Sequence, residues 1–174
     1  MRYEQIYKDH PDLNLIEELY DISFPEDERI PFHILKRTLS DERLMYAIYE
    51  DTLIGMFFLF IDEDLVYLSY LCVDERRRGK GYGSAILKHI TKMYEDKRIV
   101  LDIEEVKTDS ENYNERKKRK DFYLHNGYQS TGIFYHIYDV DYELLSRGGT
   151  VTKEQWHHLI RKHWGPRADT AIYR

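Results

Sequence analysis

Three glycines at alternate positions, Gly79, Gly81 and Gly83, separate a strand-like stretch from a helix-like one. Residues 65–73 before them are almost all apolar or aromatic, which predicts a buried strand. After them, apolar residues recur at helical spacing while lysines lie on the other side, which predicts an amphipathic helix. Glycine lacks a Cβ, and the first N–H groups of a helix lack partners within the helix. This turn can therefore bind a pyrophosphate.

Three phosphate-binding patterns compete for this turn. The dinucleotide fingerprint places its third glycine three residues after the second, whereas Gly83 follows Gly81 by two. The mononucleotide loop ends in Gly-Lys-Ser/Thr, whereas Gly81 follows Lys80 here. The third pattern, Arg/Gln-x-x-Gly-x-Gly/Ala, is matched by Arg78-x-x-Gly81-x-Gly83. In this motif the chain resembles the GCN5-related N-acetyltransferase (GNAT) superfamily, whose loop holds the pyrophosphate of acetyl-coenzyme A (acetyl-CoA).

A second motif supports the same resemblance. A charged run beginning at Asn112-Tyr-Asn114 leads to Tyr123-x-x-x-Gly127-Tyr128. In the superfamily, the helix after the fifth strand begins near an Asn and ends in Tyr-x-x-x-Gly-Phe/Tyr. The resemblance extends over about residues 1–147. It implies an α/β fold with a central, mostly antiparallel sheet that is splayed between its fourth and fifth strands and flanked by helices.

Periodicity along the chain agrees with this fold. Helices are expected around residues 13–20 and 31–39, and strands at 2–8, 44–49, 53–61, 65–73, 99–103, 131–138 and 140–145. Residues 148–174 extend past the superfamily core. There, Thr152-x-x-Gln155 matches a capping box, and two tryptophans share one apolar stripe. We therefore expect an acetyltransferase domain over 1–147 and a helical extension over 148–174 that packs on the core or on a second subunit.

Composition limits the classes of function. The chain has 174 residues, 42% of them hydrophobic, which suits one folded domain. Its formal net charge of −6 argues against a nucleic-acid binder and favours a cationic substrate such as an amine. We find neither an apolar run of membrane length nor a targeting leader, and we expect a cytoplasmic protein that is a monomer or a homodimer. One cysteine and scattered histidines predict no metal site.

The resemblance assigns the cofactor-binding residues. The backbone of Leu71, Cys72 and Val73 is expected alongside the pantetheine arm. The backbone N–H groups of the turn are expected to bind the pyrophosphate, and Asn114 is expected to contact the cofactor as well. The turn consists of Arg78, Gly79, Lys80, Gly81, Tyr82, Gly83 and Ser84.

Acetyl transfer to an amine also needs an acid for the leaving thiolate and a route for the proton of the amine. In the superfamily a tyrosine at the place of Tyr123 commonly serves as the general acid, and a phenol stays protonated at neutral pH. For the base, many members use a Glu on the fourth strand, but residues 65–73 contain no acidic residue. A water chain is one alternative, and the carboxylates that remain are Glu104, Glu105, Glu26, Asp27 and Glu28.

Two further features have a structural and a functional interpretation. Cys72 could attack a thioester, but no His is near it in sequence, and a small buried side chain is the better interpretation. The basic run 115–120 is either a solvated helix face or an attraction for coenzyme A phosphates. The sequence thus predicts transfer of an acetyl group from acetyl-CoA to a primary amine of a small molecule by direct attack in a ternary complex. The alternatives are a non-catalytic acyl-CoA-binding module and a protein or peptide amine acetyltransferase.

Overall fold

Antiparallel strands covered by helices build both units of the computed structural model of this chain, which describes residues 1–26, 29–137 and 139–174. The first unit holds residues 1–61 and 67–89, and the second holds residues 62–66 and 90–174. The strand pairs described within each unit are antiparallel. The predicted α/β class, with mostly antiparallel strands and flanking helices, is confirmed. The splay between the fourth and fifth strands and the domain division at residue 147 stay predictions.

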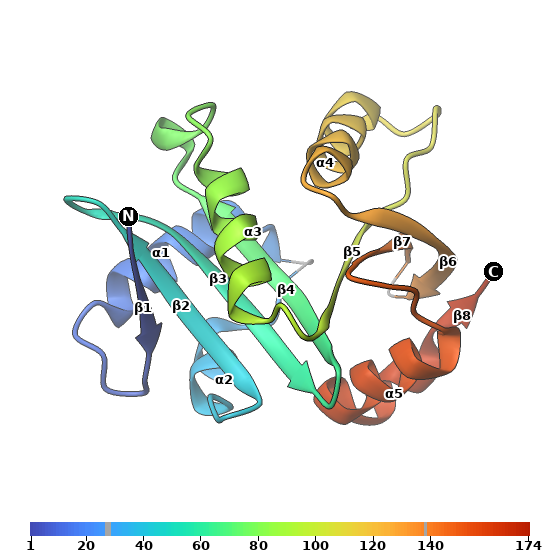
Figure 1. Ribbon diagram of the computed structural model, residues 1–174, viewed down its shortest axis with the longest axis horizontal. Coiled ribbons are helices and arrows are strands. Elements are labelled where there is room, and N and C mark those ends of the chain that lie inside the picture. Colours follow the sequence, from blue (N-terminus) through green and yellow to red (C-terminus); the bar gives the residue numbers. More distant parts are fainter. Residues whose placement is uncertain (27–28, 138) are drawn as a thin grey trace. The chain divides into compact units, whose positions relative to one another are not determined.

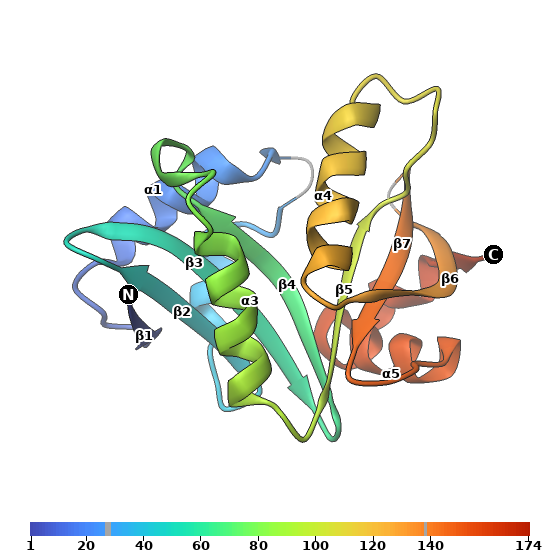
Figure 2. The ribbon, with the colours of Figure 1, turned by 45° about the horizontal axis from the view of Figure 1, so that its top comes forward.

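The first unit orders its strands β1-β2-β3-β4. The helices α1 and α2 lie on one face of these strands and α3 lies on the other (Figure 1 and Figure 2). Residues 54–60 of β3 are all buried, as expected for a strand covered on both faces. The elements are β1 (Arg2–Ile6), α1 (Leu13–Ser23), α2 (Phe32–Arg37), β2 (Arg43–Tyr49), β3 (Leu53–Asp62), β4 (Leu65–Val73), the 3-10 helix η2 (Glu75–Arg77) and α3 (Tyr82–Met93). The last residue of β3, the first two of β4 and the last four of α3 belong to the second unit.

The second unit orders its strands β5-β7-β6-β8. The helix α4 lies on one face of these strands and α5 lies on the other (Figure 2). The elements are β5 (Arg98–Glu104), α4 (Tyr113–His125), β6 (Gln129–Ile137), β7 (Val140–Arg147), α5 (Lys153–Trp164), the 3-10 helix η3 (Gly165–Thr170) and β8 (Ile172–Tyr173). The predicted capping box of α5 is present, with Thr152 accepting from the Gln155 N–H. The Trp156 ring is buried 5.9 Å from the Tyr135 ring of β6, so α5 packs on strands of its own unit.

The structure differs from the expected elements in two places. Pro31 stands at the N-cap position of α2, with φ −52° and ψ 131°, whereas we expected it to be the first helical residue. Because the ψ of Pro31 is extended and not helical, the helix begins one residue later, at Phe32. The short strand β8 was not predicted, because two residues are too few for a periodic signal. It pairs with β6 through Tyr173 opposite Tyr135.

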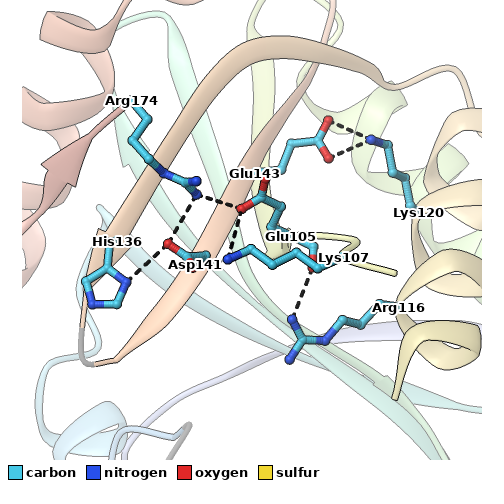
Figure 3. A network of polar contacts seen from close by, with 8 residues as sticks. All are labelled: Glu105, Lys107, Arg116, Lys120, His136, Asp141, Glu143 and Arg174. Atoms are coloured by element: carbon cyan, nitrogen blue, oxygen red, sulfur yellow. Dashed lines mark hydrogen bonds and ion pairs between the residues drawn. The ribbon is translucent and has the colours of Figure 1, made fainter. Parts of the chain in front are cut away.

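A network of ion pairs surrounds Asp141 at the start of β7 (Figure 3). Its carboxylate accepts from Lys107, from His136 Nδ1 at 3.1 Å and from the Arg174 guanidinium at 3.1 Å. Arg174 also reaches Glu105 Oε2 at 2.6 Å. The hydrogen bond from Lys107 is the main cause that lowers the pKa of Asp141, opposed by partial burial and aided by His136 and Arg174. The network therefore connects the segment after β5, the adjoining ends of β6 and β7, and the residue after β8.

This lowered pKa predicts a pH dependence of stability for Asp141→Asn. A depressed native pKa stabilises the folded state above the ordinary carboxyl pKa, about 3.9, and this contribution is lost as the pH falls through the native pKa. The difference in free energy of unfolding between wild type and Asp141→Asn should be largest near pH 7 and should shrink towards zero in stronger acid. Urea unfolding between pH 2 and pH 7 measures it. Asp9→Asn, at an exposed site in the first unit, is the control, and an equal pH dependence in both variants would contradict the prediction.

Candidate active site

The glycine-rich turn follows β4 and is held by contacts within the first unit. Asp74 caps η2, since its Oδ1 accepts from the Arg76 N–H at 3.0 Å. The Arg78 side chain returns to β4 and donates from Nε to the Val73 carbonyl at 3.2 Å. These contacts fix the path of the chain before the first glycine.

Gly79 and Gly81 leave open space beside the backbone. They have φ values of +75° and +81°, a conformation that side chains with a Cβ rarely adopt. A Cβ built on either glycine would meet no heavy atom within 4 Å. The first hydrogen bond of α3 runs from the Ala85 N–H to the Gly81 carbonyl at 3.1 Å, so the N–H groups of residues 82–84 precede the helical ladder. These donors therefore have no partner within the helix, and the pyrophosphate site at this turn stays a prediction.

Tyr82, the first residue of α3, is tied to the turn between β2 and β3. Its hydroxyl donates to Glu50 Oε2 at 2.6 Å, and this bond is the main cause that raises the pKa of Tyr82. Sequence reasoning missed this contact, because nothing in the local pattern pairs residues that lie 32 positions apart. The contact supports the helix start that carries the N–H donors.

The last residues of β4 carry the proposed pantetheine contacts. Cys72 is buried, and burial raises the pKa of its thiol, so the thiol stays protonated at neutral pH. This agrees with a packing role and not with a nucleophile. Gly55 of β3 lies so close that its Cβ would stand 2.6 Å from the Cys72 carbonyl oxygen. Glycine at position 55 therefore allows β4 to take the path seen here.

In the second unit, Tyr123 lies in the last turn of α4 (Tyr113–His125). The side chain is half-buried and its ring meets the rings of Phe122 and Tyr128 at 5.1 and 5.7 Å. Its hydroxyl makes no hydrogen bond with any residue that the structure describes. Burial raises the pKa of Tyr123 to about 12, while the nearby Arg119 lowers it and Asp102 raises it. The phenol therefore holds its proton through the neutral range.

Comparison with known families identifies the chain. The model of the acetyltransferase (GNAT) domain matches residues 40–130, more than half of the chain. The chain belongs to the GNAT family of acetyltransferases. No curated protein sequence matches it.

Solved structures share the fold of this GNAT chain. A GNAT-family protein from Bacteroides thetaiotaomicron superposes with a TM-score of 0.78 at 22% identity, over 95% of this chain and 99% of that one. An aminoglycoside 6'-N-acetyltransferase complexed with coenzyme A gives 0.67 at 16% identity, over 84% and 96% of the two chains. The ribosomal-protein-S18-alanine N-acetyltransferase from Escherichia coli gives 0.60 at 15% identity, over 88% and 97%. At these identities the likeness establishes the fold alone.

Two of the carboxylates considered as bases in the GNAT chain, Glu104 and Glu105, form ion pairs. Glu104 is buried, with Oε1 at 2.6 Å from the Arg116 guanidinium and Oε2 at 3.3 Å from that of Arg119. Glu105 pairs with Arg174 and Lys107. Glu26 is exposed. Asp27 and Glu28 lie outside the described residues. A carboxylate held between two guanidinium groups has its lone pairs occupied, which argues against Glu104 as a base.

The motif residues before and after Tyr123 have distinct structural roles. Asn112 stands at the N-cap position of α4, and its Oδ1 accepts from Arg116 Nε at 2.6 Å instead of from a backbone N–H; Asn114 lies exposed in the first turn. Gly127 follows the helix with φ +83°, and a Cβ there would stand 2.2 Å from the Arg147 guanidinium. That guanidinium donates to the Asn126 carbonyl at the helix end. Glycine at position 127 therefore allows both the positive φ and the close approach of the Arg147 guanidinium.

Within the described residues, no group of three or more His, Cys, Asp or Glu side chains is placed to hold a metal ion. In the same part of the chain, no helix has the length and apolar character needed to span a membrane.

The Gly127 geometry predicts that Gly127→Ala destabilises the protein more than Gly132→Ala does. Gly132 has a similar φ of +76° but open space at its Cβ, so it reports the backbone strain alone. Gly127→Ala must also displace Arg147 from the Asn126 carbonyl, and a hydrogen bond to a charged group contributes about 1.5–3 kcal/mol. Urea unfolding measures both variants, and equal destabilisation would contradict the role assigned to Arg147.

Proposed function

We propose that this GNAT chain transfers the acetyl group of acetyl-CoA to a primary amine of a small molecule, by direct attack within a ternary complex. The observation that carries the proposal is the open glycine turn before α3, with positive φ at Gly79 and Gly81 and free space at both Cβ positions. Membership of the GNAT family gives the reaction type. A fold neighbour that acts on aminoglycosides was solved with coenzyme A, which supports the cofactor and the small-molecule acceptor.

The residues of the turn fit the pyrophosphate of acetyl-CoA. The N–H groups from Arg78 to Ser84 would hold it, and hydrogen bonds to a charged group contribute about 1.5–3 kcal/mol each. Arg77 and Lys80 add positive charge beside the turn, and neither forms an ion pair with a described residue. The backbone of Leu71, Cys72 and Val73 is proposed to hold the pantetheine arm. Asn114 remains a proposed cofactor contact from the first turn of α4.

The proposed chemistry needs one proton donor from the chain. Acetyl-CoA supplies, when bound, a thioester that a neutral amine can attack. Tyr123 donates its phenolic proton to the sulfur as the carbon–sulfur bond breaks, and the phenolate regains a proton from solvent. The raised pKa keeps this donor protonated in the neutral range.

The attacking amine loses its proton to water in this proposal. An alkylammonium has a pKa near 10, so a small neutral fraction exists at pH 7. We infer that Glu104 does not take this proton, because two guanidinium groups already occupy its oxygens. A water path replaces a single base.

The acceptor is proposed to be cationic, because the chain carries a formal net charge of −6. Fold neighbours act on aminoglycosides and on a ribosomal-protein alanine, so a peptide amine is the second candidate acceptor. A screen of small amines and peptides that follows free-thiol release from acetyl-CoA separates the two. Binding of acetyl-CoA without turnover on any amine would favour the non-catalytic alternative.

Gly81→Val is expected to weaken acetyl-CoA binding tenfold or more, equivalent to about 1.4 kcal/mol or beyond. Its side chain would fill the space where phosphate oxygens are proposed to lie. Titration calorimetry measures the affinity, and circular dichroism checks the fold. Gly132→Val, with a similar φ and equally open space in the second unit, is the matched control and should bind as wild type does. Unchanged affinity in a folded Gly81→Val variant would exclude this turn as the pyrophosphate site.

Tyr123→Phe is expected to lower kcat by about 10²–10⁴, the usual range for a positioned acid, while the affinity for acetyl-CoA changes little. The variant keeps the ring and its contacts with Phe122 and Tyr128 but removes the donor. Steady-state kinetics at saturating acceptor provide the measurement, in the range where chemistry limits the rate. Full turnover would return Tyr123 to a packing role.

A further inference from the structure

The helix α4 is attached to its unit largely by ion pairs, with the half-buried Tyr123 ring against Tyr128 as an apolar contact at its end. None of its residues is buried, whereas α5 on the other face of the same strands buries Trp156, Leu159, Ile160 and His163. A helix without a buried apolar face needs other contacts to fix its position. In α4 these contacts come from the basic run 115–120. The sequence alone had allowed two roles for this run, a solvated helix face or an attraction for coenzyme A phosphates.

Lys120 makes the most specific of these contacts. Its ammonium lies 2.9 and 2.6 Å from the two carboxylate oxygens of Glu143 on β7 (Figure 3). The Glu143 side chain is only 1% exposed, and Lys120 is the partner seen for its carboxylate among the described residues. A buried carboxylate without a counter-charge is costly, so this contact strongly favours one position of the turn that carries Lys120.

A second buried carboxylate, Glu104, binds cations of α4 that precede Lys120 in the helix. This second buried carboxylate, at the end of β5, accepts from Arg116 and Arg119 of α4. Three cations of the basic run are therefore fixed by two carboxylates inside the unit. The remaining pair, Lys117 with Asp121 at 2.6 Å, is exposed and lies within the helix itself.

The ion pairs of Arg119 and Lys120 lie within one helical turn of Tyr123. Lys120 and Tyr123 are three residues apart in α4, which makes them neighbours on the helix surface. Arg119 lies close enough to Tyr123 to influence its phenol electrostatically. A shift of the Lys120 turn therefore moves the Tyr123 hydroxyl, and a proton donor misplaced by about 1 Å can cost about 10²-fold in rate.

We propose that Lys120 and Glu143 form a positioning pair that sets the place of the Tyr123 hydroxyl for proton donation. The inference rests on the proposed role of Tyr123. Neither residue is proposed to touch the substrate or the cofactor, and their effect passes through α4.

The test compares Lys120→Met with Lys117→Met. Both remove one lysine from the same helix, but only Lys120 faces a buried carboxylate. Lys120→Met should lower kcat tenfold or more and leave the affinity for acetyl-CoA within twofold of wild type. Lys117→Met should stay within twofold in both quantities. Lys120→Arg, which keeps a cation opposite Glu143, should recover most of the lost kcat.

A double-variant cycle separates positioning from general damage. In the Tyr123→Phe background, Lys120→Met should have little further effect on kcat, because the hydroxyl that it positions is gone. Hydrogen exchange of the amides of residues 113–125 should be faster in Lys120→Met than in Lys117→Met. An equal loss of kcat with and without the Tyr123 hydroxyl would overturn the inference, as would wild-type kcat in Lys120→Met.

A second variant covers the case in which Lys120→Met fails to fold. The double variant Lys120→Met/Glu143→Met removes the buried charge together with its partner and should fold, with kcat still lowered tenfold or more. Wild-type kcat in this double variant would also overturn the inference. If Tyr123→Phe itself keeps full turnover, the proposed acid fails. If Tyr123→Phe is impaired but Lys120→Met is not, only the positioning inference fails.

Discussion

Two carboxylates inside the second unit, Glu104 and Glu143, constrain the structure around the proposed acid. Burying a carboxylate without a counter-charge is costly, and α4 supplies cations to both of these carboxylates. The helix therefore needs little apolar surface, and its outer residues are left for other contacts. The same requirement explains why so charged a helix lies against the strands of its unit.

The groups proposed for the chemistry are divided between the two units of the chain. The first unit offers backbone donors on a turn shaped by Gly79 and Gly81, and these depend on conformation and not on side-chain identity. The second unit offers a phenol, Tyr123, whose protonation depends on burial. The proposed anion binding thus depends on backbone geometry in one unit, and the proposed proton donation depends on desolvation of the phenol in the other.

Much of the fold could be predicted from the sequence, because the signals are local. The apolar run 65–73 coincides with β4, the capping residue Thr152 begins α5, and the glycine spacing locates the turn before α3. The partners of charged residues could not be predicted. The sequence shows a basic run but not that Glu143 lies inside the unit opposite Lys120, and it does not connect Tyr82 with Glu50. These contacts depend on strands and turns meeting across long separations in the chain.

The burial of Cys72 has a practical consequence for studying motion in this protein. It is the single cysteine of the chain, and its thiol is enclosed and protonated. Thiol-reactive dyes and spin labels are electrophiles that exposed thiolates attack, so the natural protein should remain unlabelled under native conditions. A cysteine introduced at an exposed position such as Lys118 would then carry the label alone, and α4 could be followed spectroscopically without first replacing Cys72.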